Sequence, residues 1–153
     1  MAYYKKVLQP DETVKYVGKL HWFIYKHALV FLALTPVAIY LLSILPENLR
    51  GVRLFVLFIF PVLALISFVR AWFVQITTEV VVTDKRVIHK VGWIVRRTEE
   101  MNVSKVETVD VIQGVAGRVF DFGAVLIKGF GGSWEPLQHI ASPLLLRNAI
   151  IVG

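Results

Sequence analysis

Two long uncharged stretches constrain the fold of this chain more than any other feature. Residues 28–45 and 54–69 read ALVFLALTPVAIYLLSIL and LFVLFIFPVLALISFV, and a short polar break separates them. As α-helices they would be about 27 Å and about 24 Å long, close to the roughly 30 Å hydrocarbon core of a bilayer. The second reaches about 30 Å if it continues through Phe73, with Arg70 extending to the headgroups.

The alternative to a membrane hairpin is a buried helical hairpin in a soluble core. A soluble helix would show a polar stripe, and neither stretch has one. Both contain an internal proline, which membrane helices tolerate better than soluble helices do. Aromatic and basic side chains flank the stretches, as interfacial anchors of membrane helices do. These candidate anchors are Trp22, Tyr25, Lys26, Arg70 and Trp72. We therefore predict a transmembrane hairpin over residues 22–74.

The distribution of Lys and Arg predicts the orientation of this hairpin. Basic residues are frequent before residue 27 and after residue 69, whereas the connecting break holds only Arg50 and Arg53. The positive-inside rule then places both termini in the cytoplasm and the short loop outside. The formal net charge of +6 agrees better with attraction to anionic lipid than with nucleic-acid binding in such an apolar chain.

The sequence after the hairpin has the alternation and turn signals of short strands. We expect strands at 80–83, 86–91, 96–103, 106–112, 124–129 and 134–140, a short helical turn within 114–123, and a helix from Ser142-Pro143. This order predicts a small antiparallel barrel or sandwich closed by a C-terminal helix over residues 75–153.

One further strand is expected before the hairpin, within the N-terminal segment 1–21. Residues 13–20, TVKYVGKL, alternate apolar or aromatic side chains with lysines. A lone strand leaves backbone donors and acceptors unpaired. We therefore expect this segment to join the sheet formed after residue 77, with Tyr16 and Val14 in the core.

The sequence shows no pattern that indicates catalysis, a metal or a cofactor. It has no cysteine, and no two of its four histidines have the i, i+4 spacing of a helical metal site. Glu99 and Glu100 are adjacent, so on a strand they would face opposite ways and not act as a carboxylate pair. No serine lies in a Gly-x-Ser-x-Gly turn. We predict that the protein is not an enzyme.

A basic hairpin tip around Gly92 is the candidate contact site. Its residues are Lys85, Arg86, Lys90, Trp93, Ile94, Arg96 and Arg97. Cations beside an exposed aromatic tip suit anionic headgroups, at about 1 kcal/mol for each cation near the surface. Two alternatives remain open. The arginines would pair with Glu99 and Glu100 in an ordinary solvated hairpin, or the apolar tip would contact another protein subunit.

Three stretches of the chain carry a family resemblance. They are TTEVVVTDKRVIHKVGWIVRRTEEMNVSKVETVDV, GRVFDFGAVLIKG and HIASPLLLRNAI, preceded by LQPDETVKYVGKLHW ahead of the hairpin. In this order, the chain resembles bacterial pleckstrin-homology-like (PH) domains of the second type, found in small membrane proteins. The resemblance implies a bent antiparallel barrel capped by a C-terminal helix, and a family without defined catalytic chemistry.

The leading interpretation is therefore a non-enzymatic, membrane-anchored interaction module without a cofactor. It would be a scaffold, accessory subunit or assembly factor in the bacterial cytoplasmic (inner) membrane. Its partners would be the bilayer and other membrane subunits or further copies of itself, and not nucleic acid. The alternative is a module that senses anionic lipids at the cytoplasmic face. A transporter subunit is disfavoured because neither apolar stretch carries an ionisable residue.

Overall fold

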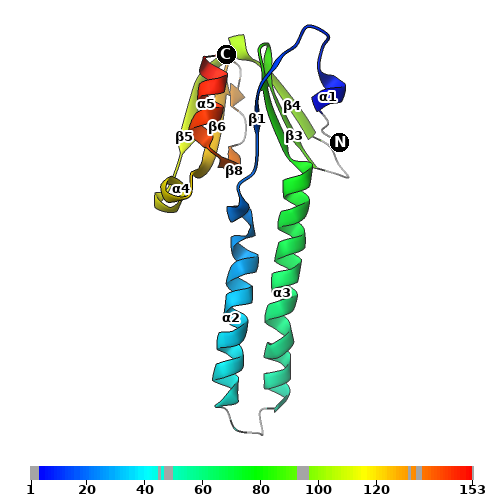
Figure 1. The fold of residues 1–153 in the computed structure, drawn as a ribbon, viewed down its shortest axis with the longest axis vertical. Coiled ribbons are helices and arrows are strands. Elements are labelled where there is room, and N and C mark those ends of the chain that lie inside the picture. The colour runs from blue at the N-terminus through cyan, green and yellow to red at the C-terminus, as the bar shows by residue number, and fades with distance from the viewer. Residues whose placement is uncertain are drawn as a thin grey trace. The chain divides into compact units, whose positions relative to one another are not determined.

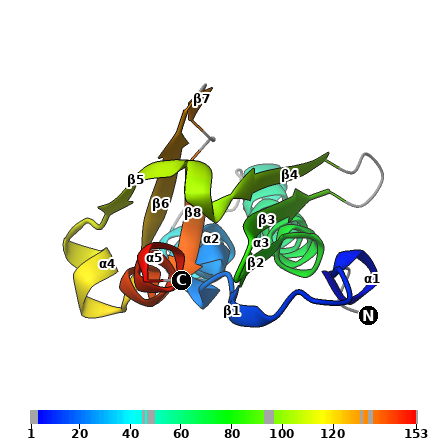
Figure 2. The ribbon, with the colours of Figure 1, turned by 90° about the horizontal axis from the view of Figure 1, so that it is seen from above.

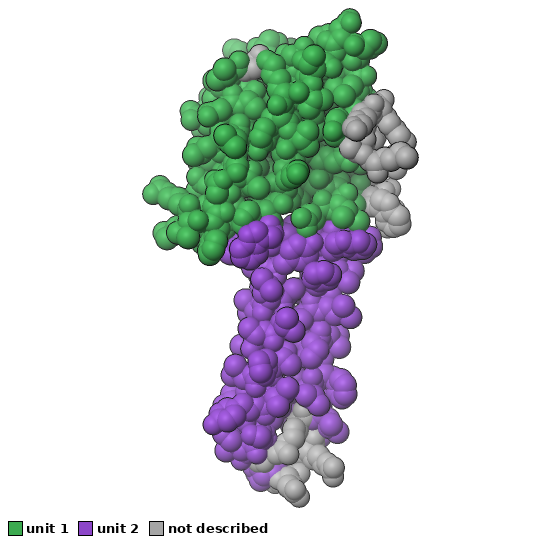
Figure 3. All heavy atoms as spheres, in the orientation of Figure 1, with its two compact units in different colours: residues 1–21, 74–153 green, residues 22–73 purple. Residues whose placement is uncertain are grey.

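A computed structural model describes residues 4–44, 46, 50–92, 97–130, 132–133 and 136–152. The chain divides into two compact units, which are coloured separately in Figure 3. The domain unit combines Met1–His21 with Val74–Gly153, and the hairpin unit is Trp22–Phe73. The domain unit is thus assembled from both flanks of the hairpin.

The hairpin unit consists of two long helices (Figure 1). A 3-10 turn, η1 (Trp22–Tyr25), leads into α2 (Lys26–Ser43), and α3 spans Arg50–Thr77 and so extends into the domain unit. The rings of Tyr25 and Phe68 lie 5.2 Å apart, which places the start of α2 beside the later part of α3. Helix α3 is therefore longer than the uncharged stretch that predicted it, whereas α2 has 18 residues, as many as its stretch.

Most large apolar side chains of these helices are exposed, whereas Ala28 and Leu42 of α2 and Ala64 and Ala71 of α3 are buried. Pro36 and Pro61 are accommodated inside continuous helices. The hydroxyl of Thr35 donates to the Phe31 carbonyl at 3.0 Å, so this polar group is satisfied within its own helix. Among the described residues, Trp22–Ser43 and Leu54–Thr77 are long and apolar enough to cross a membrane, by length and composition.

Sheet A of the domain unit has the strand order β1-β2-β3-β4. Its strands are β1 (Val14–Gly18), β2 (Glu79–Thr83), β3 (Arg86–Val91) and β4 (Arg97–Asn102), all paired antiparallel. Strand β1 pairs with β2 across the whole hairpin insertion, with Val17 opposite Val81. A register shift between Val14 and Tyr16 interrupts the alternation. Tyr16 accordingly packs on the core, whereas Val14 is exposed and does not join it.

Sheet B is built from β5 (Val106–Ile112), β6 (Phe122–Gly129), β7 (Gly132–Ser133) and β8 (Leu137–Ala141). Strand β6 is central, because β5, β7 and β8 all pair with it. Short helices η3 (Val103–Lys105) and α4 (Val115–Val119) precede and follow β5, and α5 (Pro143–Ile151) ends the fold. A further helical turn, α1 (Tyr4–Val7), opens the described chain. Figure 2 shows the two sheets from above.

The two sheets meet at one corner and do not form the closed barrel that we expected. Beyond β1, Leu20 forms a bridge with Ile140, His21 N donates to His139 O at 2.7 Å, and Ala141 N donates to Lys19 O at 2.9 Å. At the other side, η3 carries the chain from β4 to β5, and these two strands do not pair among the described residues. The η3 turn lies between β4 and β5 in the chain. The fold is therefore two antiparallel sheets, one on each side of this turn, with the helix α5.

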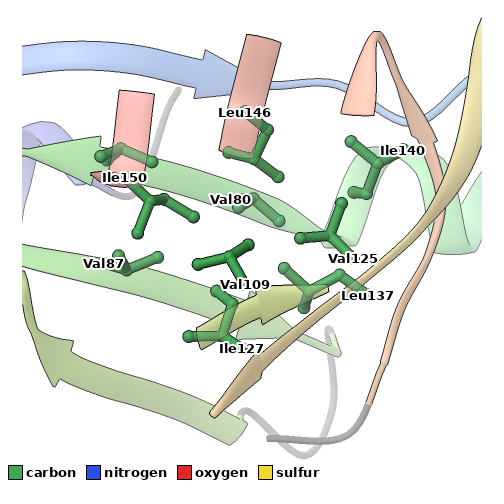
Figure 4. Packing of buried hydrophobic residues seen from close by; sticks show 10 residues of the cluster. Val80, Val87, Val109, Val125, Ile127, Leu137, Ile140, Leu146 and Ile150 are labelled. Carbon is green, nitrogen blue, oxygen red and sulfur yellow. The ribbon is translucent and has the colours of Figure 1, made fainter. Parts of the chain in front are cut away.

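The core lies between these sheets and α5 (Figure 4). Leu146 and Ile150, four residues apart on α5, are almost fully buried against Val80 and Val82 of sheet A and Val125 and Ile127 of sheet B. Helix α5 starts at the predicted residue, with Pro143 in its first turn. Ser142 does not cap it through its side chain. Its hydroxyl donates instead to Asp121 Oδ2 at 2.5 Å.

Candidate functional site

One arginine of the predicted basic tip, Arg86, forms its hydrogen bonds inside the domain. Arg86 begins β3, and its side chain is only 14% exposed. Its Nε and Nη2 donate to the two oxygens of Glu12, each at 2.9 Å, and Nη2 also donates to the Val7 carbonyl at 2.9 Å. Its Nη1 donates to Glu100 Oε2 at 2.6 Å. Four of its five N–H donors are thus engaged within the domain, and the contact of Arg86 with a headgroup or partner stays a prediction.

Glu12 is the buried half of this ion pair. Its side chain is 0% exposed. Besides the bidentate contact with Arg86, it accepts from the Thr83 hydroxyl at 2.7 Å and from Gln9 N at 3.0 Å. The hydrogen bond from Arg86, together with those from Gln9 and Thr83, overcomes desolvation and lowers the pKa of Glu12 to about 2. The hydrogen bond to Glu12 also raises the pKa of Arg86. Both groups are therefore charged at neutral pH.

The network joins two distant pieces of the chain, the segment before β1 and the turn between β2 and β3. Thr83 Oγ1 donates to Glu12 and accepts from the backbone N of Lys85 and of Arg86, in the turn between β2 and β3. Thr13 N donates to Asp84 Oδ1 at 2.9 Å, and Asp84 N donates to Thr13 O at 3.1 Å. The segment before β1 is thus held on the β2–β3 turn. Sequence reasoning missed Glu12, because nothing in its local pattern indicates a partner 74 residues away.

The other residues of the predicted tip separate into two groups. Arg97, at the start of β4, is 65% exposed and its Nη2 lies 2.7 Å from Glu99 Oε1, while Lys85 is exposed and Lys90 half-buried. Glu99 Oε2 also lies 3.9 Å from His89 Nδ1. Trp93, Ile94 and Arg96 lie outside the described residues. The described arginines therefore pair with Glu99 and Glu100, which is the alternative arrangement considered from the sequence.

The candidate membrane anchors gather at one end of the hairpin unit. Trp22 and Tyr25 lie in η1, and Lys26 begins α2 with its Nζ 5.5 Å from the centre of the Phe23 ring. Arg70 and Trp72 lie on α3, just beyond Phe68, whose ring contacts Tyr25. Trp22, Arg70 and Trp72 are exposed. This is the end at which the chain enters and leaves the hairpin, as interfacial anchors require.

Within the part of the chain that the structure describes, no three His, Cys, Asp or Glu side chains gather as metal ligands. What the described residues offer is a pair of long apolar helices, a small two-sheet domain and surfaces for contact with other molecules.

The chain is thus a small antiparallel domain that ends in a helix and is interrupted by an apolar hairpin. Comparison with known families gives its identity: the Bacterial PH domain family matches residues 27–148, so the chain belongs to that family. PH domains are generally non-enzymatic modules that mediate lipid or protein interactions. No curated protein and no solved structure matches the chain.

Proposed function

We propose that this protein is a membrane-anchored PH-type interaction module that acts as a scaffold, accessory subunit or assembly factor of a membrane protein complex. The observation that carries the proposal is the pairing of β1 with β2. One strand precedes the hairpin and the other follows it. Because the domain is built from both flanks of the hairpin, the chain must enter and leave the bilayer on the same side.

The hairpin unit supports membrane anchoring. Its two candidate spans of 22 and 24 residues would be about 33 Å and about 36 Å long, enough for a hydrocarbon core of roughly 30 Å with slight tilt. Most of their large apolar side chains are exposed, a state that lipid stabilises and water does not. With the positive-inside bias, the domain unit and both termini would lie on the cytoplasmic face of the bacterial inner membrane.

The scaffold role is supported by the way in which the domain is attached. Two chain connections, at His21 and Val74, join it to the hairpin, and both adjoining segments belong to the folded domain. A domain held at two points turns less freely than one on a single linker, which favours a fixed docking surface. The described arginines of the basic tip are also engaged with glutamates. Lys85 is exposed and could contact anionic headgroups, so sensing of anionic lipid is the second candidate function.

Topology is the first test. The chain has no cysteine, so single cysteines can be introduced without a background. Asn48→Cys, in the connecting loop, should react with a membrane-impermeant thiol reagent in intact cells. Phe130→Cys, at an exposed position of the domain, should react only after the membrane is permeabilised. Reaction at Phe130 in intact cells with protection at Asn48 would reject the proposed orientation.

The second test separates the two candidate roles. The full chain, cross-linked in membranes and purified in mild detergent, should retain a stoichiometric protein partner or further copies of itself. The sensor alternative predicts no such partner. It predicts instead saturable retention of anionic lipid that the Lys85→Glu variant reduces and that salt weakens. That second result would replace the scaffold role by lipid sensing.

A further inference from the structure

One end of the domain unit lies next to the point at which the chain passes into the hairpin. His21, the last residue of the domain's first segment, stacks on Phe122 with ring centroids 5.1 Å apart. Phe122 pairs with Ala141, and Ala141 N donates to the carbonyl of Lys19. The start of β6, the end of β8 and the last residues before Trp22 therefore occupy a single site.

Helices α4 and α5 begin around this same site. Gln113 Nε2, just before α4, donates to the carbonyls of Gly117 and Phe122 at 3.2 and 3.1 Å. A Cβ placed on Gly123 would meet Gln113 Cγ at 2.7 Å, Ile112 O at 2.8 Å and Pro143 Cγ at 3.2 Å. The end of β5, the α4 turn and the first turn of α5 are thus packed around the start of β6.

These elements leave six large apolar side chains exposed. We call them the apolar end: Ile112, Val115, Val119, Phe120, Leu144 and Leu145. Val115 and Val119, at the two ends of α4, are 84% and 72% exposed. Neighbouring side chains of the same elements, such as Val109 and Leu146, are fully buried, so the exposed set is not part of the domain core. Several large apolar residues gathered on the surface of a small domain mark a contact site.

We propose that the apolar end is a membrane-docking surface that inserts into the interfacial layer of the bilayer that holds the hairpin. This inference rests on the proposed membrane anchoring and extends it to the domain itself. The occupant follows from chain connectivity. His21 is in contact with Phe122, and Trp22, the next residue, begins the first candidate span. The surface around Phe122 is therefore joined, through His21, directly to the first residue of that span, and this connection is the reason to infer lipid as its occupant.

The chemistry of the surrounding residues agrees with a lipid surface. Aliphatic side chains and one phenylalanine can enter the boundary between headgroups and acyl chains to a depth of about 5–10 Å. Arg118, between Val115 and Val119 on α4, and Lys19, before His21, are exposed cations at the same end. Asp121 is the nearby acid, and its Oδ2 accepts from the Ser142 hydroxyl. Basic charge beside an apolar surface favours contact with anionic headgroups.

Lipid quenching of fluorescent labels tests this surface in the full chain. The single variants Val115→Cys, Phe130→Cys and Phe58→Cys would each carry a small fluorophore, in nanodiscs that hold one protein each. Phe130, 78% exposed, follows the opposite end of β6 and is the matched apolar control. Phe58 is exposed on α3 and reports on the hairpin. The quenchers are lipids with a nitroxide at a shallow or a deep position of the acyl chain.

The expected result is strong quenching at Val115 by the shallow nitroxide, several-fold above that at Phe130, with Phe58 quenched as well because it lies inside the span Leu54–Thr77. Quenching at Phe58 without quenching at Val115 would overturn the docking surface and leave the membrane anchor intact. Loss of quenching at both positions would overturn both proposals. Protection of Val115 from lipid and water-soluble quenchers alike would mean that protein covers this end, which also contradicts lipid docking.

A charge variant checks that the apolar side chains cause the docking. With the label moved to Leu144→Cys, the double change Val115→Asp and Val119→Asp should lower lipid quenching several-fold. Phe130→Asp should leave it unchanged, because this substitution adds the same type of charge at the other end of the domain. Both aspartates replace exposed side chains, so the core is untouched. Unchanged quenching in the double variant would contradict the proposal.

Discussion

The guanidinium of Arg86 and the carboxylate of Glu12 form a bidentate pair, with Nε–Oε1 and Nη2–Oε2 distances of 2.9 Å, although the two residues are 74 positions apart. The hairpin lies between them in the chain. The pair therefore fastens the segment before the first helix to the turn after the second, and it reinforces the β1–β2 pairing from outside the sheet.

Removing one partner of this pair should destabilise the domain. Glu12→Gln leaves the Arg86 charge partly buried, with Glu100 as its remaining acidic partner, and we expect a loss of about 3 kcal/mol, the lower end for a broken buried pair. The measurement is hydrogen exchange of the buried β2 and β3 amides of Val81 and Ile88 in the full chain in detergent micelles. The control, Asp110→Asn, breaks the exposed pair with Lys128 and should cost less than about 1 kcal/mol. Equal effects of the two substitutions would refute a special role for Glu12.

Acid should weaken the domain through the same carboxylate. The pKa of Glu12 is about 2 in the folded chain against 4.5 for an ordinary glutamate. Because the folded-state pKa is depressed, the stabilisation is fully present above pH 4.5 and is lost as the pH falls from 4.5 towards 2. Its size is on the order of 3 kcal/mol, from 1.36 kcal/mol per pKa unit. Exchange protection of Val81 measured across this range should fall in the wild type, and the fall should be smaller in Glu12→Gln. Parallel curves for the two proteins would contradict this assignment.

Gly123 should be intolerant of even one methyl group. Its Cβ would lie 2.8 Å from the Ile112 carbonyl and 2.7 Å from Gln113 Cγ, so backbone or side chain must move. We expect Gly123→Ala to cost about 1–3 kcal/mol, as overpacking does. Gly114→Ala is the control, since its Cβ meets nothing within 4 Å, and it should change stability by less than about 1 kcal/mol. Thermal unfolding of the two variants in the same detergent compares them, and a tolerated Gly123→Ala would show that the start of β6 can shift.

The domain unit should fold without the hairpin but not without β1. Replacing residues 22–73 by a flexible Gly-Ser linker keeps the pairing of β1 with β2 and the Leu20–Ile140 bridge, and should give a soluble, cooperatively unfolding protein. A version that starts at Val74 loses Glu12, the β1 ladder and the Leu20–Ile140 bridge. It leaves one edge of β2 and the Arg86 charge uncovered, so it should unfold at much lower denaturant concentration. Matching denaturation midpoints for the two versions would make the N-terminal segment a separate arm.

Local pattern was sufficient to predict most elements of this fold. The uncharged stretches indicated two helices because no other secondary structure satisfies the backbone in a long apolar run. The alternation at 86–91 and 106–112 predicted β3 and β5 to the residue, and Ser142-Pro143 marked the start of α5. The family resemblance was also confirmed. Each of these signals resides in neighbouring residues, so the sequence alone contains them.

Only the tertiary structure decided how Arg86 is used and how the sheets close. From the sequence alone, Arg86 was predicted to be one of the cations of the basic tip. In the fold it is the partner of Glu12, because β1 approaches β2 and brings that carboxylate within hydrogen-bonding distance. The expected barrel is two sheets joined at the Leu20–Ile140 bridge. The apolar end likewise combines residues 112–120 with Leu144 and Leu145, which are distant in sequence. Pairings across dozens of residues depend on the course of the backbone in three dimensions. Local periodicity depends only on neighbouring residues, so it does not predict these pairings.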